Sequence, residues 1–420
     1  MVRLYRLLLG GFTFCLLYSE CFGQVWEKLV VPGLTYRMEL DSTLPRMIHV
    51  LRWSPNSSVT AKPELAGGTV FEPNATNGRE TISEMAKRTS ALAVINADFF
   101  PFGTQPSGDP LGLMVREGEL LSLPYQNRSA FAWGKSKSFA TGATSAQIQM
   151  KLGQGLPIPI PQYNEECKPE SLCLNTPAAG IVKCIGSGTH AIIRVREGAF
   201  KLGSKITGEV EQVVSGQNIT IPSGKCVLTG TGGSTGEVTK LKAGEIVEIT
   251  LGVAPFDWTK LEHAVGGGPN LVTRGLVSID AAAQSFNADF SEKRHPRTAV
   301  GRAADGDLLF VTIDGRQELS AGATMDELAR VMQRLGCMDA INLDGGGSTT
   351  INILGLTLNR PSGGREREVA NGICFYGKAP VVEQDGMTIN GPTTMVPKTT
   401  TYLKVLDSTK MPIQNSEVLW

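Results

Sequence analysis

The chain has 420 residues, with 40 basic and 40 acidic side chains, so its formal net charge is zero. This balance, together with the absence of a basic run, argues against a nucleic-acid-binding protein. The length indicates two or three domains, at roughly 150 residues each. None of the 4 histidines forms an H-x-x-x-H or H-x-H pair, so we expect no zinc hydrolase of the common kinds and no metal site: His49, His190, His263 and His295.

Residues 1–23 have the pattern of a signal peptide. Arg3 and Arg6 precede an apolar run over residues 7–17, which is shorter than a membrane span. We therefore expect export to a secreted, periplasmic or cell-surface location, with no membrane span in the mature chain. Cys21 offers a lipid anchor as the alternative.

The cysteines that follow the leader are even in number, which favours disulfides in an oxidising compartment. Cys167 and Cys173 would close the shortest loop, but the sequence does not fix the pairing. The six candidates are Cys167, Cys173, Cys184, Cys226, Cys337 and Cys374.

The N-terminal part of the expected catalytic domain, residues 24–378, alternates strands with one helix. Residues 33–53 alternate polar and apolar side chains, which predicts two strands joined near Pro45. Thr81 followed by Glu84 is typical of a capped helix start, and this helix should end near Ser90. A buried strand is expected over residues 91–95, and a polar loop follows it.

Two later sections are rich in strand-forming residues. Residues 141–255 have little helical periodicity and many β-branched residues, Gly and Pro, so we expect a β-rich middle section of the same domain. Residues 379–420 are rich in Thr, Val and Pro and indicate the incomplete start of an Ig-like β-sandwich domain. The expected fold class is α+β, with a mixed β-sheet core and few helices.

The helix over residues 324–336 has the strongest local pattern. Its apolar residues lie on one face, Thr324 precedes Glu327 by three residues, and Gly336 closes the C-terminus. It joins the strand that ends before Asp314 to the strand that ends before Asp344. We therefore expect these strands to be parallel neighbours, with both carboxylates in one crevice.

The stretch from Asp344 to Thr349 combines a carboxylate with three glycines and two hydroxyls. Packing does not require three consecutive glycines, which are costly to order. We expect backbone amides of this loop to face an anionic group, although a tight glycine-rich turn is the simpler alternative.

Four strand-end loops carry the same kinds of side chains, in which arginine suits phosphate and carboxylates suit proton transfer or sugar binding. Taken singly, each residue also has a structural explanation, such as a turn, a loop cap or a surface ion pair. The polar residues concerned are Asn96 and Asp98; His295, Arg297 and Thr298; Asp314 and Arg316; and Asp344, Ser348 and Thr349.

As an ordered set, these motifs resemble the phosphodiester glycosidases, over about residues 33–377. The resemblance implies an α+β catalytic domain that releases a sugar from a sugar-1-phosphodiester. It is carried by Ser83–Ala86, Ala93–Phe100, Gly266–Pro269, Pro296–Gly301, Asp314–Arg316 with Gly322, and Asn342–Thr349.

From these residues we predict an exported hydrolase that cleaves at the anomeric carbon. The expected catalytic residues are Asp344 first and Asp314 second, with Arg297 and Arg316 stabilising the departing phosphate. We expect substrate binding by Asn96, Asp98, Thr298, Gly345, Gly346, Gly347, Ser348 and Thr349.

Two alternatives remain open at this level. One is a secreted glycan-binding protein without turnover, and the other is a metal-dependent phosphodiesterase that cleaves the P–O bond. We expect a glycosyl phosphodiester or phosphate-linked polysaccharide as the partner. No cofactor is predicted, although the sequence leaves a divalent cation open.

Overall fold

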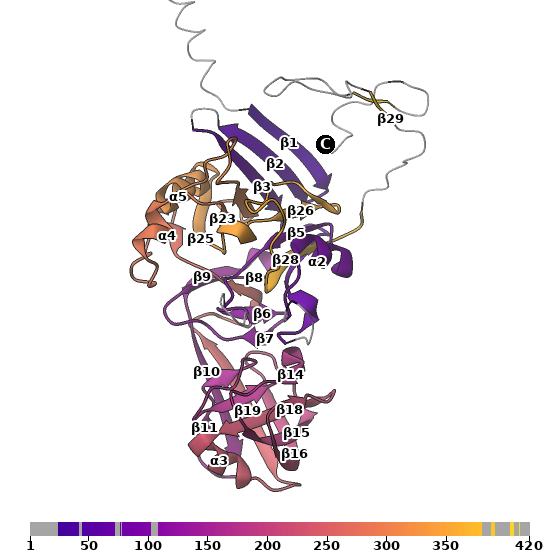
Figure 1. Cartoon of the computed structure of the whole chain (residues 1–420), viewed down its shortest axis with the longest axis vertical. Helices are drawn as coiled ribbons and strands as arrows, with labels where there is room; N and C mark the ends of the chain where they lie inside the picture. The colour runs from indigo at the N-terminus through magenta and orange to yellow at the C-terminus, as the bar shows by residue number, and fades with distance from the viewer. Residues whose placement is uncertain are drawn as a thin grey trace, which may run out of the picture.

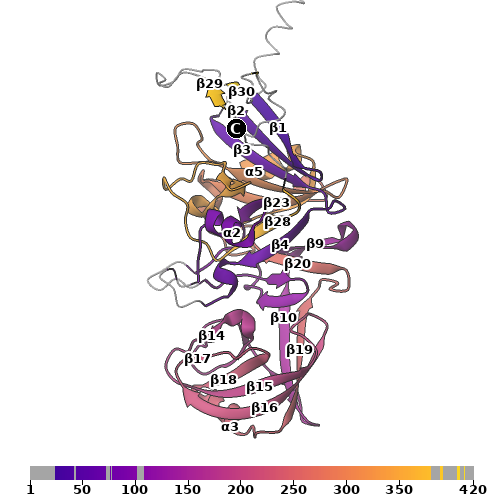
Figure 2. The same ribbon diagram turned by 90° about the vertical axis from the view of Figure 1, so that its right-hand side faces the viewer.

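The computed structural model describes residues 24–41, 44–71, 76, 78–101, 108–379, 388–390, 404–406 and 411. These residues form an upper body of three sheets and a lower lobe built around one large sheet (Figures 1 and 2). The expected leader lies outside the described residues, and so does most of the expected Ig-like segment. Of that segment, β29 (Thr388–Asn390) and β30 (Lys404–Leu406) pair antiparallel.

The upper body is built on an eight-stranded main sheet whose neighbouring strands all pair antiparallel. The strand order places β23 between β24 and β25. In order across the sheet the strands are β1 (Gln24–Val31), β2 (Leu34–Asp41), β3 (Arg46–Trp53), β24 (Leu308–Ile313), β23 (Arg297–Ala303), β25 (Cys337–Asn342), β21 (Asn270–Thr273) and β22 (Leu276–Val277).

Two five-stranded sheets complete the upper body. The cover sheet consists of β27 (Leu356–Thr357), β26 (Ile351–Ile353), β5 (Ala93–Asn96), β28 (Asn371–Tyr376) and β4 (Thr60–Leu65). The middle sheet consists of β7 (Glu119–Ser122), β6 (Met114–Arg116), β20 (Leu261–Gly266), β8 (Ser129–Gly134) and β9 (Phe139–Ala143).

Successive side chains of the main-sheet strands point to opposite faces of the sheet, so each strand contributes to two hydrophobic cores. Leu51, Phe310 and Ile341 point to the core shared with the cover sheet, where Phe310 and Phe375 meet edge to face with ring centroids 5.0 Å apart. Val50 and Val311 point to the opposite face, which is covered by α5 (Met325–Arg334). The period-2 pattern thus fixes which face of each strand meets the cover sheet.

The two predicted helices begin where the sequence indicates. Thr81 caps α2 (Ile82–Thr89) and Thr324 caps α5, each in a reciprocal capping box with the glutamate three residues later. Each cap contributes about 1 kcal/mol to the free energy of unfolding. The remaining short helices are α3 (Thr235–Thr239) and α4 (Ala288–Glu292).

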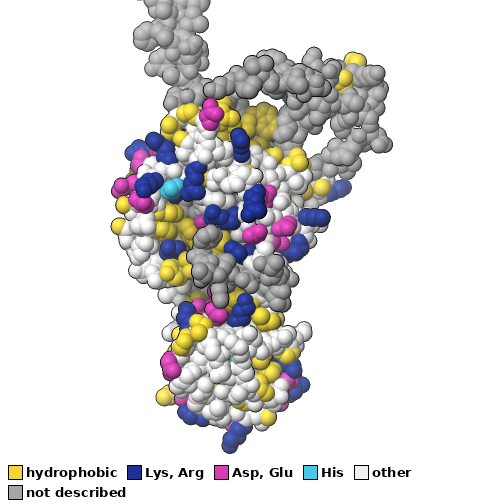
Figure 3. All heavy atoms as spheres, viewed as in Figure 1, with side chains coloured by type: hydrophobic (Ala, Val, Ile, Leu, Met, Phe, Trp, Pro, Cys, Tyr) yellow, Lys and Arg dark blue, Asp and Glu magenta, His cyan; other side chains and the backbone are white. Residues whose placement is uncertain are grey.

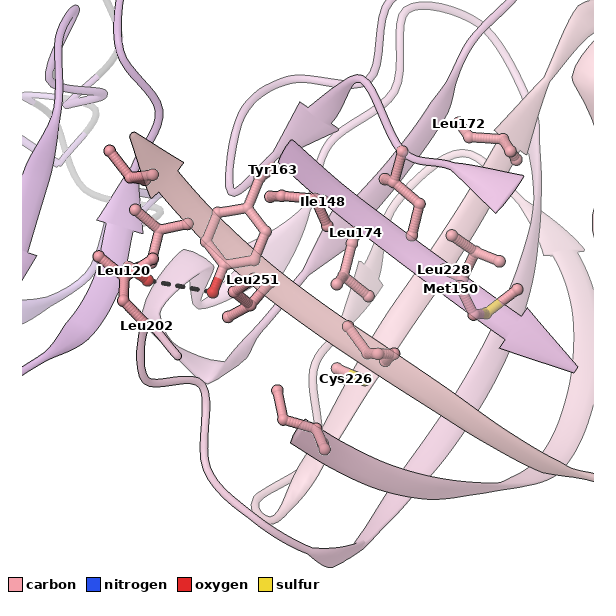
Figure 4. Close-up of a cluster of buried hydrophobic side chains, with 14 of the residues drawn as sticks. Leu120, Ile148, Met150, Tyr163, Leu172, Leu174, Leu202, Cys226, Leu228 and Leu251 are labelled. Carbon is pink, nitrogen blue, oxygen red and sulfur yellow. Dashed lines mark hydrogen bonds between the residues drawn. The ribbon is translucent and has the colours of Figure 1, made fainter. Parts of the chain in front are cut away.

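The lower lobe occupies residues 145–254 (Figure 1). Its sheet runs in the order β11 (Ile158–Pro159), β10 (Ser145–Leu152), β19 (Ile246–Ala254), β16 (Lys205–Gly216), β15 (Gly188–Glu197), β18 (Lys225–Thr231), β13 (Leu172–Asn175) and β12 (Gln162–Tyr163). A separate pair is formed by β14 (Ile181–Val182) and β17 (Ile219–Thr220). Figure 4 shows the buried core of the lobe, where the Tyr163 hydroxyl donates to the Leu120 carbonyl oxygen of the middle sheet at 3.0 Å.

Three sequence-based expectations need correction. The β24 and β25 strands point the same way, but they are not neighbours, because β23 lies between them and pairs antiparallel with both. The core sheets are therefore antiparallel instead of mixed; among the described strands, only β12 and β13 pair parallel. The cysteines form no disulfide in the described residues, since Cys167, Cys173, Cys184, Cys226, Cys337 and Cys374 are all free and buried.

In the part of the chain that the structure describes, no helix is both long and apolar enough to cross a membrane.

Candidate active site

Asp344 lies two residues beyond the end of β25, where the strand leaves the core. Leu343 still packs in the core under the cover sheet, while Asp344 is partly exposed. The Asp344 amide donates to the Ala97 carbonyl oxygen at 2.9 Å, and its carbonyl oxygen accepts from the Asn96 side chain at 2.7 Å. The last residue of β5 and the residue after it therefore hold the backbone of Asp344 on both sides.

The three glycines let this loop approach two other parts of the chain. A Cβ on Gly345 would lie 2.7 Å from the Pro296 carbonyl oxygen, and one on Gly347 would lie 2.3 Å from Nη2 of Arg367. Gly346 has a φ of +63°, which favours glycine. The close approach expected from the sequence is thus to Pro296 and Arg367.

Several loop amides are already used inside the protein. The amides of Gly346, Ser348 and Thr349 donate to the carbonyl oxygens of Pro296, Gly345 and Gly346 at 2.9, 3.2 and 3.4 Å. In this conformation they are not available to an anion. The positive charge at the loop comes instead from arginine side chains.

Asn96 and Thr298, both expected to bind substrate, are fully buried. The Thr298 hydroxyl donates to Asn96 Oδ1 at 2.9 Å, and the Thr350 amide donates to the same oxygen at 3.0 Å. Since neither side chain reaches the surface, their contacts make them positioning residues for Asp344 and the following loop.

Asp98 follows β5 and is only 2% exposed. Its carboxylate accepts from the Phe99 and Gly112 amides, both at 2.7 Å. A Cβ on Gly266 would lie 2.4 Å from Asp98 Oδ2, so the Gly266 to Pro269 motif includes a glycine that leaves room for this carboxylate.

Burial raises the pKa of both carboxyl groups near the loop. The pKa of Asp344 is raised to about 6, mainly by burial, while the Ser348 side chain and the charge of Arg367 oppose this change. The pKa of Asp98 is raised to about 7 by burial, and the charge of Asp344 adds to this. Carboxyl groups that titrate near neutrality are suited to proton transfer.

Asp314 lies at the same edge of the main sheet but faces a different space. Its carboxylate accepts from the Asn359 side chain at 3.1 Å and from the Arg360 amide at 3.0 Å, and it lies 3.7 Å from Nε2 of His49. These residues line a cavity of about 410 Å³ whose lining does not include Asp344. The two aspartates expected in one crevice are therefore separated by the start of β23.

The two predicted arginines differ in their surroundings. Arg297 is 1% exposed and donates through Nε and Nη2 to the carbonyl oxygens of Ala323, Phe290 and Lys293. Its contacts fix the start of β23. Arg316 is exposed, and its guanidinium lies 3.5 Å from the position that a Gly346 Cβ would take.

Sequence reasoning missed two arginines near Asp344. Arg367 lies against Gly347, and Nη1 is 3.5 Å from Ser348 Oγ. Arg128 stands immediately before β8, and its charge lowers the pKa of both Asp344 and Asp98. The sequence patterns predict no strand at residues 129–134, so nothing in the sequence marked Arg128.

Among the described residues, no group of three or more His, Cys, Asp or Glu side chains could hold a metal ion. Figure 3 shows Lys and Arg side chains distributed over this face of the upper body, with acidic side chains between them. The viewed face therefore carries charges of both signs, in line with the balanced composition.

Comparison with known sequences confirms the resemblance drawn from the motifs. Residues 189–376 match the sequence profile of the phosphodiester glycosidase family. The match starts in β15 and ends with β28, so it includes Asp314 and Asp344 but neither Asn96 nor Asp98.

Curated relatives match over shorter stretches. The uncharacterized protein YomE of the SPbeta prophage of Bacillus subtilis is 40% identical over 84 residues, which is 20% of this chain and 13% of that protein. N-acetylglucosamine-1-phosphodiester alpha-N-acetylglucosaminidase of Bos taurus is 39% identical over 78 residues, which is 19% of this chain and 14% of that enzyme. The matches thus cover a small part of each relative.

Among solved structures, a hypothetical protein from Synechocystis has a similar fold. Its TM-score is 0.69 at 22% sequence identity, and the alignment covers 84% of this chain and 63% of that protein. At this identity the similarity establishes the fold alone.

Proposed function

We propose that this chain, whose residues 189–376 match the phosphodiester glycosidase family, hydrolyses a sugar-1-phosphodiester at the anomeric carbon. The observation that carries the proposal is the surroundings of Asp344. A partly exposed carboxylate with a pKa of about 6 lies beside a glycine loop, and Arg316 and Arg367 lie against that loop. This arrangement joins a group for sugar chemistry to charges for a phosphate.

In the proposed reaction, the bond between C1 of the sugar and the phosphate oxygen breaks. Its electron pair leaves with the phosphate, which departs as a phosphate monoester, while the oxygen of water forms the new bond to C1. Asp344 directs this water and accepts its proton, which then passes to solvent. Because the leaving group is already stable as an anion, little help from a strong acid is needed.

The arginines stabilise the charge that develops on the leaving phosphate. Arg316 and Arg367 lie along Gly346 and Gly347, so both can act at the same end of the site. Arg297 contributes indirectly, because it fixes the start of β23 and hence the Pro296 carbonyl oxygen that accepts from Gly346.

Asp314 is the second carboxylate of the proposal. It is 4% exposed and lines the neighbouring cavity with His49 and Asn359, so its contribution would come through that cavity. The Asn359 side chain also donates to the Thr349 carbonyl oxygen at 3.0 Å, which connects Asp314 to the glycine loop.

The deciding experiment is hydrolysis of a synthetic N-acetylglucosamine-1-phosphodiester in ¹⁸O-labelled water. We expect the label in the released sugar. Label in the phosphate product would instead establish a phosphodiesterase that cleaves P–O, and saturable binding without release would establish a glycan-binding protein. The bovine relative named for this activity makes N-acetylglucosamine the first sugar to test.

We also propose that the protein is exported. The support is the leader pattern of Arg3 and Arg6 followed by the apolar run of residues 7–17. N-terminal sequencing of the protein recovered from the culture medium or cell envelope should begin after the leader, near Gln24; an intact Met1 would contradict this proposal.

A further inference from the structure

Arg128 lies among three aromatic rings, close to the proposed catalytic residues. Its Cζ lies 4.3 Å from the ring centroid of Phe286 and 5.0 Å from those of Phe99 and Tyr125. Phe99 directly follows Asp98 in the chain, so these rings form an aromatic shelf beside the carboxyl groups of the site.

The protein holds Arg128 in this place through the next residue. The Ser129 amide donates to Gln284 Oε1 at 2.9 Å, and Gln284 Nε2 donates to Ser129 Oγ at 2.8 Å. Both side chains are buried, which ties the start of β8 to the segment that carries Phe286. Phe286 in turn stacks on Phe290 with ring centroids 4.8 Å apart.

The guanidinium of Arg128 lacks hydrogen-bond and ion-pair partners within the described part of the protein. Its Nε is buried without a hydrogen-bond partner, and no carboxylate of the described residues forms an ion pair with its guanidinium. The negative charges of Asp98 and Asp344 nevertheless favour the charged form of the Arg128 guanidinium, so the three groups interact electrostatically. Because this guanidinium has no carboxylate partner among the described residues, an anionic ligand would complete the site.

Arg302 shows what an arginine with a purely structural role looks like in the same fold. Its Cζ lies 3.9 Å from the Phe139 ring centroid, and its Nε is likewise buried without a partner. However, Nη2 of Arg302 lies 3.9 Å from the Asp339 carboxylate, at the other end of β23 from Arg297. Arg128 has the same stacking without this charge partner.

We propose that Arg128 and its aromatic shelf form an anion subsite that binds the phosphate group of the substrate. The proposal rests on the proposed function and deepens it by adding Arg128 to Arg316 and Arg367 as a group that binds the phosphate. A planar guanidinium can offer two parallel donors to phosphate oxygens, and rings that stack on its faces leave its edge free for these donors. Its weaker hydration in the half-buried shelf favours an anion over water.

The test measures binding of inorganic phosphate to the full chain by ³¹P NMR titration, with no turnover involved. Arg128→Met should raise the phosphate dissociation constant roughly tenfold or more, because it removes charge-assisted hydrogen bonds. Arg302→Met is the matched control, since it also removes a stacked arginine, and its phosphate affinity should equal that of the wild type. Equal phosphate affinity of the Arg128→Met and Arg302→Met proteins would overturn the proposal.

Folding of each variant is checked by circular dichroism, and Arg128→Gln replaces Arg128→Met if the latter does not fold. Turnover of the synthetic diester then distinguishes a failure of the anion subsite from a failure of the proposed function. If the wild type cleaves the synthetic diester and Arg128→Met does so with unchanged KM, the subsite is wrong and the function stands. If phosphate binding depends on Arg128 but no glycosyl phosphodiester is cleaved, the anion subsite stands and the proposed function fails.

Discussion

The side-chain amide of Asn96 donates to the backbone carbonyl oxygen of Asp344 at 2.7 Å, across 248 positions of sequence. This bond joins the cover sheet, which carries Asn96 at the end of β5, to the main sheet, which carries Asp344 beyond β25. The position of the proposed catalytic carboxylate therefore depends on how the two sheets pack. A change at Asn96 should affect stability and activity together.

Replacement of Asn96 by alanine should lower the free energy of unfolding by about 2–4 kcal/mol. The substitution leaves the part-buried Asp344 carbonyl oxygen and the buried Thr350 amide without this partner. Urea unfolding of both proteins measures the change. Asn287→Ala, which removes an exposed cap of α4, is the control and should cost only about 1 kcal/mol. A smaller loss for Asn96→Ala than for the control would contradict the role of Asn96.

Asp344→Asn should reduce turnover of the synthetic diester by roughly a thousandfold or more, because the amide cannot accept a proton from water. The fold should persist, since the backbone of Asp344 makes the contacts to Ala97 and Asn96. Asp339→Asn on β25 serves as the control and should keep near-normal turnover. Activity of Asp344→Asn close to the wild-type level would remove Asp344 from the mechanism.

The pH dependence of kcat/KM should show a rising limb near pH 6. The pKa of Asp344 is raised to about 6, mainly by burial, so the carboxyl group is protonated below this pH and becomes an ionised base above it. Arg367→Met removes a charge that lowers this pKa, so the limb should move to higher pH in that variant. A limb that stays in place would show that another group controls it.

Asp98 should make the protein less stable as the pH rises. Its pKa is raised from 3.8 to about 7, so between these values the folded state binds more protons than the unfolded state. The stability from this group is fully present below its unfolded pKa and is lost as the pH rises through 7. Relative to Asp98→Asn, the wild type should lose about 2–3 kcal/mol between pH 5 and pH 8, measured by urea unfolding. A constant difference between the two proteins would contradict this assignment.

Gly347→Ala should displace the Arg367 side chain, because the new Cβ would lie 2.3 Å from Nη2. The far end of an arginine can move, so we expect a loss of stability below about 1 kcal/mol but a fall in kcat/KM of roughly tenfold or more. Gly363→Ala is the control, since its Cβ would meet only the Arg365 carbonyl oxygen at 3.8 Å. Equal kinetics for the two variants would argue against a role for Arg367.

The sequence was informative wherever a local pattern decides the structure. Capping boxes located α2 and α5, and the strand that ends at Ile313 was predicted to the residue. The motif at the end of β25 marked a glycine loop, although the amides of Gly346, Ser348 and Thr349, expected to face an anion, donate to backbone carbonyl oxygens instead. These features depend on neighbours within a few positions, which a single sequence shows directly.

The remaining features depend on contacts between distant segments. The helix from β24 to β25 suggested parallel neighbours, but β23 and β24 form an antiparallel hairpin, so β23 takes the place between them. This arrangement turns Asp314 toward His49 and away from Asp344. Arg128 and Arg367 were missed because their positions beside Asp344 arise only from the packing of three sheets.

The lower lobe leaves and rejoins the upper body through two adjacent strands, since Ser145 of β10 faces Ala254 of β19. The two ends of this segment of about 110 residues are thus directly opposite each other on paired strands. The strands that flank this segment in the chain, β9 and β20, belong to the same middle sheet, with β8 between them. The lobe is therefore a long insertion between two strands of one sheet. Contacts such as the Tyr163 hydroxyl to the Leu120 carbonyl oxygen and the Leu120 amide to the Phe200 carbonyl oxygen couple the lobe to the body that carries Asp98 and Asp344.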